Sequence, residues 1–572
     1  MLEKIKNMSE WVFLILFLGT LFCYQAIIGI QGFDMHDEGW VLSAYQQIFN
    51  DPSTCEYQFL YYNALPIGGL WNMLFGLWGI YGFRILSALC SVATAYVVYL
   101  LLRKEINRWC IFMGIMLFNL GYIMVFHHNG LTALLVALAA LFLYEGLIRS
   151  NKLWILLAGI FVGINIFTRI PNVSMFALVL VFIPFYSYNR NIRTTFQLIS
   201  MAVLGVLIGI GCELLLLHAM GHLNLFVDNF STGLSAASAD DSSHSISNLI
   251  KVYGKNYLDV YHQVAILLGI PLMIWWVYQY VRNPKYMKML LWPIIVFYFL
   301  FIYTQLKETF VLYALNYIVF GVYVFKHWRN TNKVYLITIA TIVLFFLPFG
   351  SDYGINNMGP SCIWISTPLC IGLLHELLKE NETVVAKVMR KFAYAFILAF
   401  ICQALYGVSL NCYFDSGSRL KKISRPNAVL ATTYTTSFKA DQVDTLMAHL
   451  QPLIKKNDYL LCYPSLPMAN YLTETRPYLG TSWPWVYDSE NLRYQFVKAQ
   501  ENIDELPVIL RNKSKIAKWY IYTPDWNNLN ANDQWNFPSA KMMLIMDFIT
   551  RYDYYVIWEN ELFQILKTDY KK

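Results

Sequence analysis

The chain has 572 residues, of which 57% are hydrophobic, 17% aromatic and only 14% charged. A soluble domain usually carries about 25% charged residues, so this composition excludes an ordinary soluble protein and predicts a polytopic, α-helical membrane protein. The formal net charge of +7 comes from small, dispersed groups of lysine and arginine, which gives no indication of a nucleic-acid partner.

Thirteen apolar segments are predicted to span the membrane as helices, and the first, Trp11–Ile30, is long enough to cross a bilayer core of about 30 Å. In chain order they are Trp11–Ile30, Phe83–Leu102, Cys110–Phe126, Leu131–Ile148, Leu153–Phe167, Asn172–Tyr186, Phe196–Leu217, Val260–Tyr280, Met289–Thr304, Phe310–Phe325, Val334–Phe349, Ser361–Leu378 and Phe392–Leu410. Of the 24 lysines and arginines before residue 411, 19 fall in segments that this count places in the cytoplasm. The bias follows the positive-inside rule and predicts that the N-terminus lies inside and the C-terminal part outside.

The first outer loop, residues 31–83, contains no lysine or arginine, as expected of a translocated segment. Its later part, Gln58–Ile80, is apolar but interrupted by a proline and several glycines. We therefore expect helices that lie on the membrane surface there, not a span. The segments His218–Asp259 and Gly350–Pro360 are expected to be further outer loops.

Residues 411–572 are polar and mixed, which predicts a small extracytoplasmic α/β domain after a membrane domain of residues 1–410. Strands are predicted at Asp458–Tyr463, Trp519–Tyr522, Asp553–Trp558 and Leu562–Leu566, and helices at Asp441–Leu453 and Ala540–Thr550. In the same domain, Trp483-Pro484-Trp485 could stack on sugar rings, with packing in the domain core as the favoured alternative.

The ten cysteines are scattered without a CxxC pattern, which argues against a structural zinc site. Cys55, Cys412 and Cys462 are expected outside, and Cys362 lies at the outer end of a predicted span. Whether any of these four form a disulfide is left open.

Asp37 and Glu38 follow the first span within the stretch His36–Trp40. A carboxylate just outside the membrane can take a proton from a sugar hydroxyl and make it a nucleophile. The alternative is an ordinary solvated acidic loop. Gly39 is expected to let the backbone turn closely beside the pair.

The layout of the spans, and most sharply residues 34–104, resembles the GT-C superfamily of membrane glycosyltransferases. It is similar to the bacterial aminoarabinose transferases and the protein O-mannosyltransferases: an acidic pair follows helix 1, a glycine-rich run YYNALPIGGLWNMLFGLWGIYGF comes next, and Arg84 opens helix 2. The resemblance implies a GT-C-like fold that takes a sugar from a polyprenyl-phosphate carrier at the outer face, with Asp37 or Glu38 as the acidic motif. Where members often have an aspartate opening helix 4, this chain has Asn129, which leaves a second catalytic carboxylate in doubt.

The leaving phosphate of such a donor gains negative charge during transfer, and cations at the outer face can stabilise it. We predict that Lys307, together with Arg84 or Arg169, binds the donor phosphate. For Arg84 and Arg169 the alternative is snorkelling to lipid headgroups.

Five other polar residues are candidates for substrate binding because of their predicted positions: His36, Asn129, Glu213, Asp352 and Tyr313. Glu213 stands within a span, where an acid marks a functional site or a polar contact between helices. Asp352 lies in the polar stretch Ser351–Asn357, which is otherwise a plain turn. Tyr313 is otherwise a tyrosine of the interfacial belt.

A divalent metal, Mg²⁺ or Mn²⁺, is left open as a cofactor. Glu38 and His36 are the first candidates to hold it, and His127 and His128 are near them in the predicted topology. Their spacing is not diagnostic of a metal site.

The sequence therefore predicts an inverting glycosyltransferase of the bacterial inner membrane with its C-terminal domain in the periplasm. Asp37 would be the base, and the acceptor would be a glycolipid, glycan or protein of the envelope; inversion is implied by the family. Two other functions stay open. A lipid-linked sugar transporter or flippase is expected to show paired half-repeats and helices broken at mid-membrane, and an O-antigen-type ligase or polymerase would lack the acidic pair.

Overall fold

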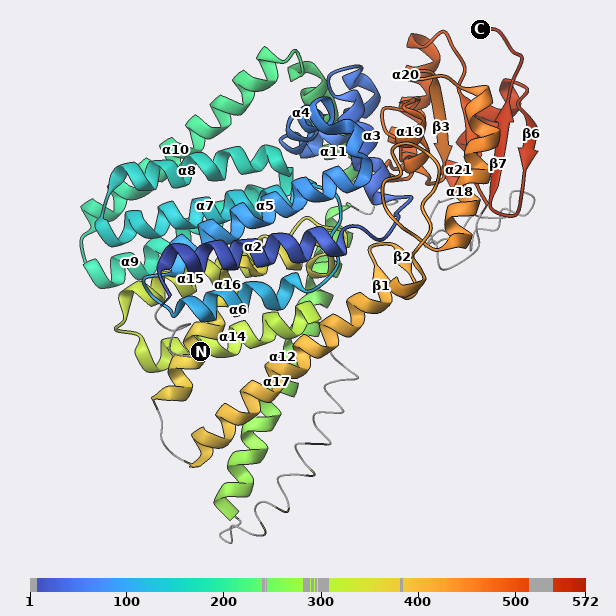
Figure 1. Ribbon diagram of the computed structural model, residues 1–572. Helices are drawn as coiled ribbons and strands as arrows, with labels where there is room; N and C mark the ends of the chain where they lie inside the picture. Colours follow the sequence, from blue (N-terminus) through green and yellow to red (C-terminus); the bar gives the residue numbers. More distant parts are fainter. Residues whose placement is uncertain are drawn as a thin grey trace.

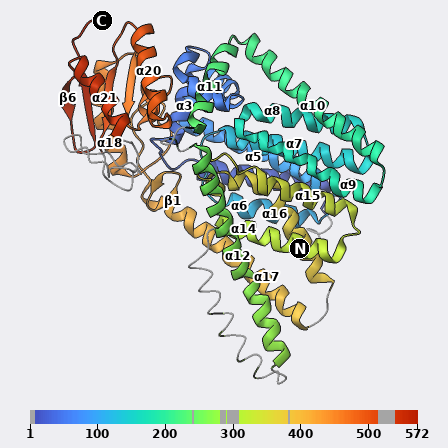
Figure 2. The ribbon, with the colours of Figure 1, turned by 180° about the vertical axis from the view of Figure 1, so that it is seen from behind.

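A computed structural model of the chain describes residues 8–238, 242, 244–280, 308–380, 384–513 and 539–572, together with 286, 289, 293 and 296. A bundle of long helices makes up most of it, and a small domain built on a sheet lies at one end of the bundle beside α3 and α11 (Figures 1 and 2). The helices up to the sheet domain are α2 (Glu10–Ile28), α3 (Asp37–Gln47), η1 (Pro52–Tyr61), α4 (Ala64–Phe75), η2 (Gly76–Trp78), α5 (Gly79–Leu102), α6 (Arg108–Asn119), α7 (His128–Arg149), α8 (Lys152–Thr168), η3 (Ile170–Val181), α9 (Phe182–Asn189), α10 (Ile192–Ala219), α11 (Leu223–Ser238), α12 (Ile246–Tyr280), α14 (Glu308–His327), α15 (Thr331–Phe346), α16 (Ile355–Lys379) and α17 (Val384–Leu410).

Within the described residues, eight helical segments are long and apolar enough to cross a membrane, and α6, α8 and α15 are shorter apolar helices. Large apolar side chains such as Val203, Leu207 and Leu215 of α10 are exposed on the outside of the bundle. Such a surface is stable in lipid and would aggregate in water. The chain is therefore a multi-pass membrane protein. The predicted span Met289–Thr304 lies in a stretch of which only single residues are described, so the expected total of thirteen stays a prediction.

Two predicted spans differ from the helices observed. Cys110–Phe126 was too long, because α6 ends at Asn119 and the chain then crosses extended to α7. The backbone groups of this extended stretch make tertiary hydrogen bonds in place of helical ones. Phe126 N donates to Phe83 O at 3.0 Å, and the Tyr45 hydroxyl donates to Phe126 O at 2.8 Å. Asn172–Tyr186 is not one α-helix, since it consists of the 3₁₀ helix η3 followed by α9.

Two expected outer loops are largely helical. His218–Asp259 contains α11 and the start of α12, and α16 begins at Ile355, inside the expected loop Gly350–Pro360. Helix α11 is apolar on one side because it packs on η1 and α8, as the stacked rings of Phe226 and Phe167 show at 5.2 Å. The polarity of these segments concealed their amphipathic pattern.

Helices α8 and α10 cross very closely because each carries two glycines four residues apart. A Cβ added at Gly159 or Gly163 of α8 would lie 2.2 Å from Ala202 O or 2.4 Å from Val206 O. The same holds for Gly205 and Gly209 of α10 against α8. Small residues spaced in this way let two helix backbones touch in a membrane, where van der Waals packing replaces the hydrophobic effect.

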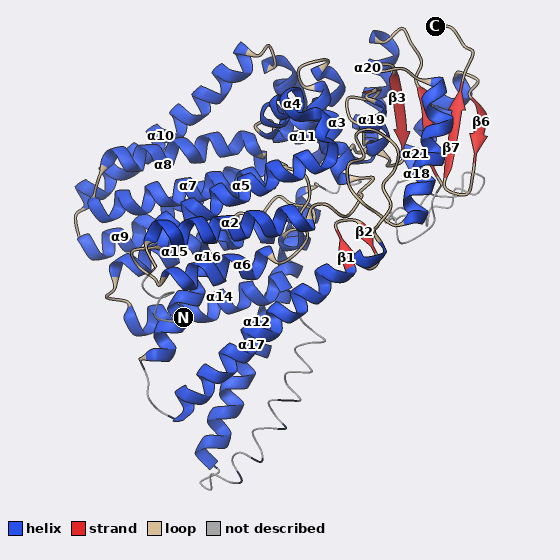
Figure 3. Cartoon of the chain, in the orientation of Figure 1, coloured by secondary structure: helices blue, strands red, loops and turns tan. Residues whose placement is uncertain are grey.

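The C-terminal domain has a five-stranded mixed sheet in the order β4-β3-β5-β7-β6 (Figure 3). Strands β4, β3 and β5 are parallel, and β7 pairs antiparallel with both β5 and β6. The remaining elements are β1 (Asn411–Cys412), β2 (Asp415–Ser416), η4 (Arg419–Lys421), α18 (Ser437–Leu450), η5 (Gln451–Leu453), β3 (Tyr459–Tyr463), α19 (Pro467–Thr473), β4 (Arg476–Pro477), η6 (Pro484–Val486), α20 (Ser489–Asn502), β5 (Val508–Asn512), α21 (Ser539–Arg551), β6 (Tyr555–Glu559) and β7 (Phe563–Lys567). The expected strands and helices of this domain are present except Trp519–Tyr522, which lies outside the described residues.

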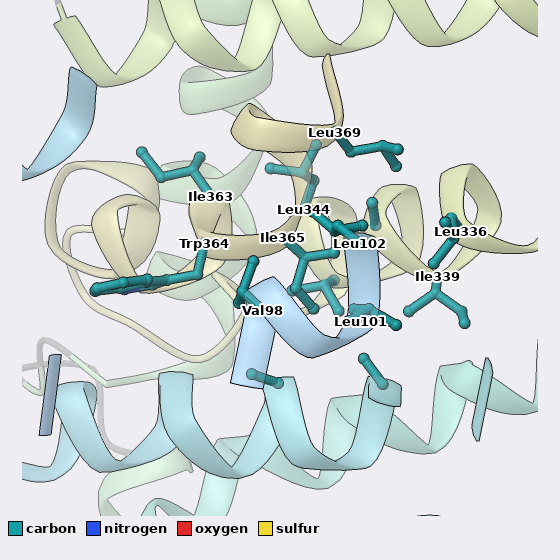
Figure 4. Packing of buried hydrophobic residues seen from close by; sticks show 14 of the residues in the cluster. Val98, Leu101, Leu102, Leu336, Ile339, Leu344, Ile363, Trp364, Ile365 and Leu369 are labelled. Carbon is teal, nitrogen blue, oxygen red and sulfur yellow. The ribbon is translucent and has the colours of Figure 1, made fainter. Parts of the chain in front are cut away.

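The core of the bundle is built where α5, α15 and α16 meet. Figure 4 shows side chains from all three helices interdigitating there. Val98, Leu102, Leu336, Leu344 and Ile365 are all at most 2% exposed. Close packing of this kind holds the helix ends in place.

Candidate functional site

The acidic stretch forms the first turn of α3, and Asp34 caps it. Its Oδ1 accepts from His36 N and its Oδ2 from Glu38 N, both at 2.8 Å. Burial and the nearby charges of Asp37 and Glu38 raise the pKa of Asp34 well above its ordinary value. The sequence reasoning missed this residue, although an aspartate just before a helical segment is a recognisable capping signal.

Glu38 is bound by Arg84 in a buried, bidentate ion pair. Arg84 Nε donates to Glu38 Oε1 at 2.9 Å and Nη2 to Oε2 at 2.7 Å, and Val125 N donates to Oε1 at 3.0 Å. The other three N–H groups of Arg84 donate to the carbonyls of Gly29, Gln31 and Gly32 at 2.9–3.0 Å. All five donors of the guanidinium are therefore used, and none is left for a phosphate.

Asp37 points the other way and is partly exposed. The Tyr413 hydroxyl, from the hairpin of β1 and β2, donates to its Oδ2. Burial raises the pKa of Asp37 to about 6, with Asp352 and Glu38 adding to the rise and the Tyr413 hydrogen bond opposing it. A carboxylate with this pKa is charged near neutral pH and still basic enough to accept a proton.

Asp352 lies near Asp37, and Arg169 lies near Asp352. Asp352 precedes α16 and lies close enough to act on the charge of Asp37. Arg169 follows α8, is 4% exposed and makes one hydrogen bond, from Nη1 to Leu347 O at 3.4 Å. Tyr61 lies within electrostatic reach of both, and its ring stacks on His128 at 4.1 Å. We call Asp37, Asp352, Arg169 and Tyr413 the acidic site.

The C-terminal domain covers this stretch directly. Gly39 lies inside the first turn of α3, and a Cβ there would come within 2.2 Å of Met468 N, so glycine is needed for the approach of α19. The expected role of Gly39 in a backbone turn was wrong. Met468 N donates to Met35 O at 3.2 Å, and His36 Nδ1 lies 3.3 Å from Ser465 Oγ. His36 thus contacts the C-terminal domain.

A buried charge cluster around Asp415 also holds the C-terminal domain against the loop that precedes α3. Asp415 pairs with Lys422 at 3.2 Å and Lys439 at 3.4 Å, and its Oδ2 accepts from Phe33 N at 3.0 Å. Lys439 also donates to Phe33 O. Burial alone would raise the pKa of Asp415, but Lys439, Lys422 and Thr435 outweigh it and hold that pKa below its ordinary value.

The other predicted substrate-binding residues lie deeper in the bundle. Asn129 Nδ2 donates to Asn357 Oδ1 at 3.3 Å, which ties α7 to α16. Glu213 is 7% exposed and accepts from Asn63 Nδ2 at 3.2 Å. Tyr313 is fully buried beside Cys362. Lys307, predicted to bind the phosphate, lies outside the described residues.

The residues suggested for a metal do not fit one. Both oxygens of Glu38 are taken by Arg84 and Val125 N, and His36 Nδ1 faces Ser465. Within the described part of the chain, no three His, Cys, Asp or Glu side chains converge as ligands. The ten cysteines, all of them described, are free thiols, so Cys55, Cys362, Cys412 and Cys462 form no disulfide here.

No family model matches the chain, and no curated protein matches its sequence. Solved structures similar to it include two of the Archaeoglobus fulgidus oligosaccharyltransferase. One, a complex with zinc and sulfate, has 12% identity, covers 87% of this chain and 69% of that chain, and has a TM-score of 0.45. The other, tethered through a disulfide bond to an acceptor peptide with an NVT sequon, has 11% identity, covers 88% and 70%, and has a TM-score of 0.42. At these values the likeness carries no argument about function.

Proposed function

We propose that this protein is a glycosyltransferase of the GT-C type, which moves a sugar from a polyprenyl-phosphate carrier to an acceptor at the outer face of a bacterial inner membrane. The observations that support it most are a partly exposed Asp37, whose pKa is raised to about 6, and a buried cation, Arg169, each of which lies within electrostatic reach of Asp352. A base and an anion-binding cation are the two groups that such a transfer needs.

Two residues of the acidic site, Asp37 and Arg169, take part directly in this reaction. The acceptor hydroxyl gives its proton to Asp37, and its oxygen attacks the anomeric carbon of the donor sugar. The bond from that carbon to the phosphate oxygen breaks, and the electron pair leaves with the phosphate, which Arg169 binds, with Lys307 as the second predicted cation. Attack and departure on opposite sides of one carbon invert its configuration.

Glu38 and Arg84 have a different role in this proposal. Their buried ion pair joins the start of α3 to α5 and to residues 29–32, so it positions Asp37 and does not react. Asp34 supports the same turn by capping it. The base is therefore Asp37, and the neighbouring carboxylate supports it through the backbone.

The test uses the full-length protein in lipid nanodiscs with a synthetic polyprenyl-phosphate sugar, and it measures release of polyprenyl phosphate. Asp37→Asn keeps the size of the side chain and removes the base, so turnover should fall by about 100-fold or more. Asp228→Asn, at an exposed position of α11, is the matched control and should turn over normally. Normal turnover by folded Asp37→Asn would refute the assignment. A transporter would instead move the intact donor across the bilayer without releasing polyprenyl phosphate.

A further inference from the structure

Two stacked indoles of the C-terminal domain lie beside the start of α3, the helix that carries Asp37. The rings of Trp483 and Trp485 are 5.4 Å apart with an angle of 25° between their planes, and both are partly exposed. Trp483 directly precedes the short helix η6, and Trp485 lies within it. Lys541 Nζ donates to Trp485 O at 3.3 Å and so ties this segment to α21.

The pair continues across the domain boundary toward the base. The ring of Trp483 lies 6.5 Å from that of His36 and 6.4 Å from that of Trp40, and these two residues flank Asp37 on either side in the sequence. The Trp40 ring in turn meets Tyr61 edge-on at 5.8 Å. We call Trp40, Tyr61, Trp483 and Trp485 the aromatic wall.

Core packing does not account for Trp483. Trp485 packs at the margin of the core that α20 and α21 form with the sheet, but Trp483 reaches out of its own domain to α3. Thr481 holds it there, since its Oγ1 accepts from Trp483 N at 3.3 Å and from Trp40 Nε1 at 3.1 Å. Within the described residues, the buried Trp483 Nε1 and Ser482 Oγ have no hydrogen-bond partner.

Flat, rigid ring faces beside unsatisfied polar atoms are suited to a sugar ring. A pyranose presents C–H groups on its faces and hydroxyl groups around its edge, so it can stack on an indole while its hydroxyls meet polar groups at the rim. An extended peptide is bound mainly through backbone hydrogen bonds to a strand edge. The aromatic wall offers faces instead of such an edge.

We propose that the aromatic wall binds a pyranose ring of the acceptor, and that the acceptor is therefore a carbohydrate chain. This inference rests on the proposed function, because it is the proposed transfer that brings a sugar acceptor to Asp37. Binding of a sugar to the aromatic wall can nevertheless be measured without turnover. Trp483 contributes the stacking face, and Trp40 positions the ring next to the base.

The test measures binding of neutral trisaccharides to the full-length protein in nanodiscs by saturation-transfer NMR. Mannotriose, maltotriose and chitotriose are the probes, and a decapeptide rich in serine, threonine and asparagine is the comparison. Trp483→Ala should weaken trisaccharide binding by about tenfold or more, and Trp483→Phe should retain part of it because a smaller ring face remains. Trp558→Ala is the matched control, since Trp558 is also partly exposed but stacks on His449 on the outer strand β6.

Two outcomes would overturn the inference: no trisaccharide binds the wild type while the peptide does, or Trp483→Ala binds trisaccharides as well as the wild type does. Loss of trisaccharide binding in Trp483→Ala, with binding retained in Trp558→Ala, supports the inference. If trisaccharides bind through Trp483 but the wild type releases no polyprenyl phosphate, the sugar site stands and the proposed function fails. The two proposals therefore fail separately.

Discussion

The hydrogen bond from Tyr413 to Asp37 leads us to predict how sugar transfer depends on pH. The hydroxyl stabilises the charged form of Asp37 and opposes burial, Asp352 and Glu38, which all raise the pKa of this carboxyl. Tyr413→Phe removes the donor and keeps the ring that packs between Tyr122 and Phe414. The pKa of Asp37 should therefore rise above about 6.

The size of the shift follows from the strength of the lost bond. A hydrogen bond to a charged group is worth about 1.5–3 kcal/mol, and about 1.4 kcal/mol corresponds to one pKa unit. The expected rise is thus about one to two units. Because Asp37 must be deprotonated to act as a base, the acid limb of the profile of kcat/KM against pH should move to higher pH by the same amount. At pH 6.5 the variant should be about 3- to 25-fold slower, whereas well above pH 8 the difference should largely disappear.

The assay is donor turnover from pH 5 to pH 9 with the protein in nanodiscs. Tyr406→Phe, an exposed tyrosine of α17, is the control and should leave the profile unchanged. A purely structural role for Tyr413 would lower the rate equally at every pH. An acid limb that stays in place, or moves to lower pH, would refute the reasoning.

Two further predictions concern the acidic site, and a third concerns the buried charge cluster around Asp415. Asp352→Asn removes a charge that raises the pKa of Asp37, so the acid limb should move to lower pH by up to about one unit, opposite to Tyr413→Phe, and the same pH series measures it. Arg169→Ala should raise the KM for the donor by about 10- to 100-fold, the cost of one charge-assisted contact, and an unchanged KM would remove Arg169 from the phosphate site. Asp415→Asn leaves Lys422 and Lys439 poorly paired and should destabilise the C-terminal domain by about 3–5 kcal/mol in denaturant unfolding. Because the pKa of Asp415 is lowered on folding, its contribution is complete above the ordinary value of about 3.9 and is lost as the pH falls through the lower folded value; Asp415→Asn should therefore unfold with less dependence on acid pH.

Hydropathy and charge were sufficient to place most helices of the bundle. The reason is that the bilayer requires a similar apolar length of every span and favours lysine and arginine in the loops on one side. They were less informative for residues 218–259, where α11 covers η1 with one apolar face and looks polar in a running average. They also placed the C-terminal end of α6 too late. The helix ends at Asn119, and the extended chain after it lets Phe126 N donate to Phe83 O. Tertiary contacts decided both cases, apolar packing in the first and a backbone hydrogen bond in the second, and a linear pattern does not contain them.

The acidic pair could be found from the sequence, but the difference between its members could not. Asp37 and Glu38 are neighbours on a helix, where successive side chains point about 100° apart, so the two have different surroundings. The structure turns Glu38 inward to Arg84 and leaves Asp37 partly exposed. The partner of Asp37 comes from Tyr413, 376 residues later, and no local signal connects the two.

These long-range contacts make the C-terminal domain part of the acidic site. The chain from β1 to α18 lies along residues 28–34: Arg419 Nη1 donates to Ile28 O at 2.8 Å, Tyr434 N to Ile30 O at 2.9 Å and Gly32 N to Tyr434 O at 2.7 Å. Residues 411–439 thus supply the hydrogen bond to the base and fix the loop that presents it, while the following segment supplies Trp483. Any displacement of this domain would change the pKa of Asp37 and the distance of the aromatic wall from it together.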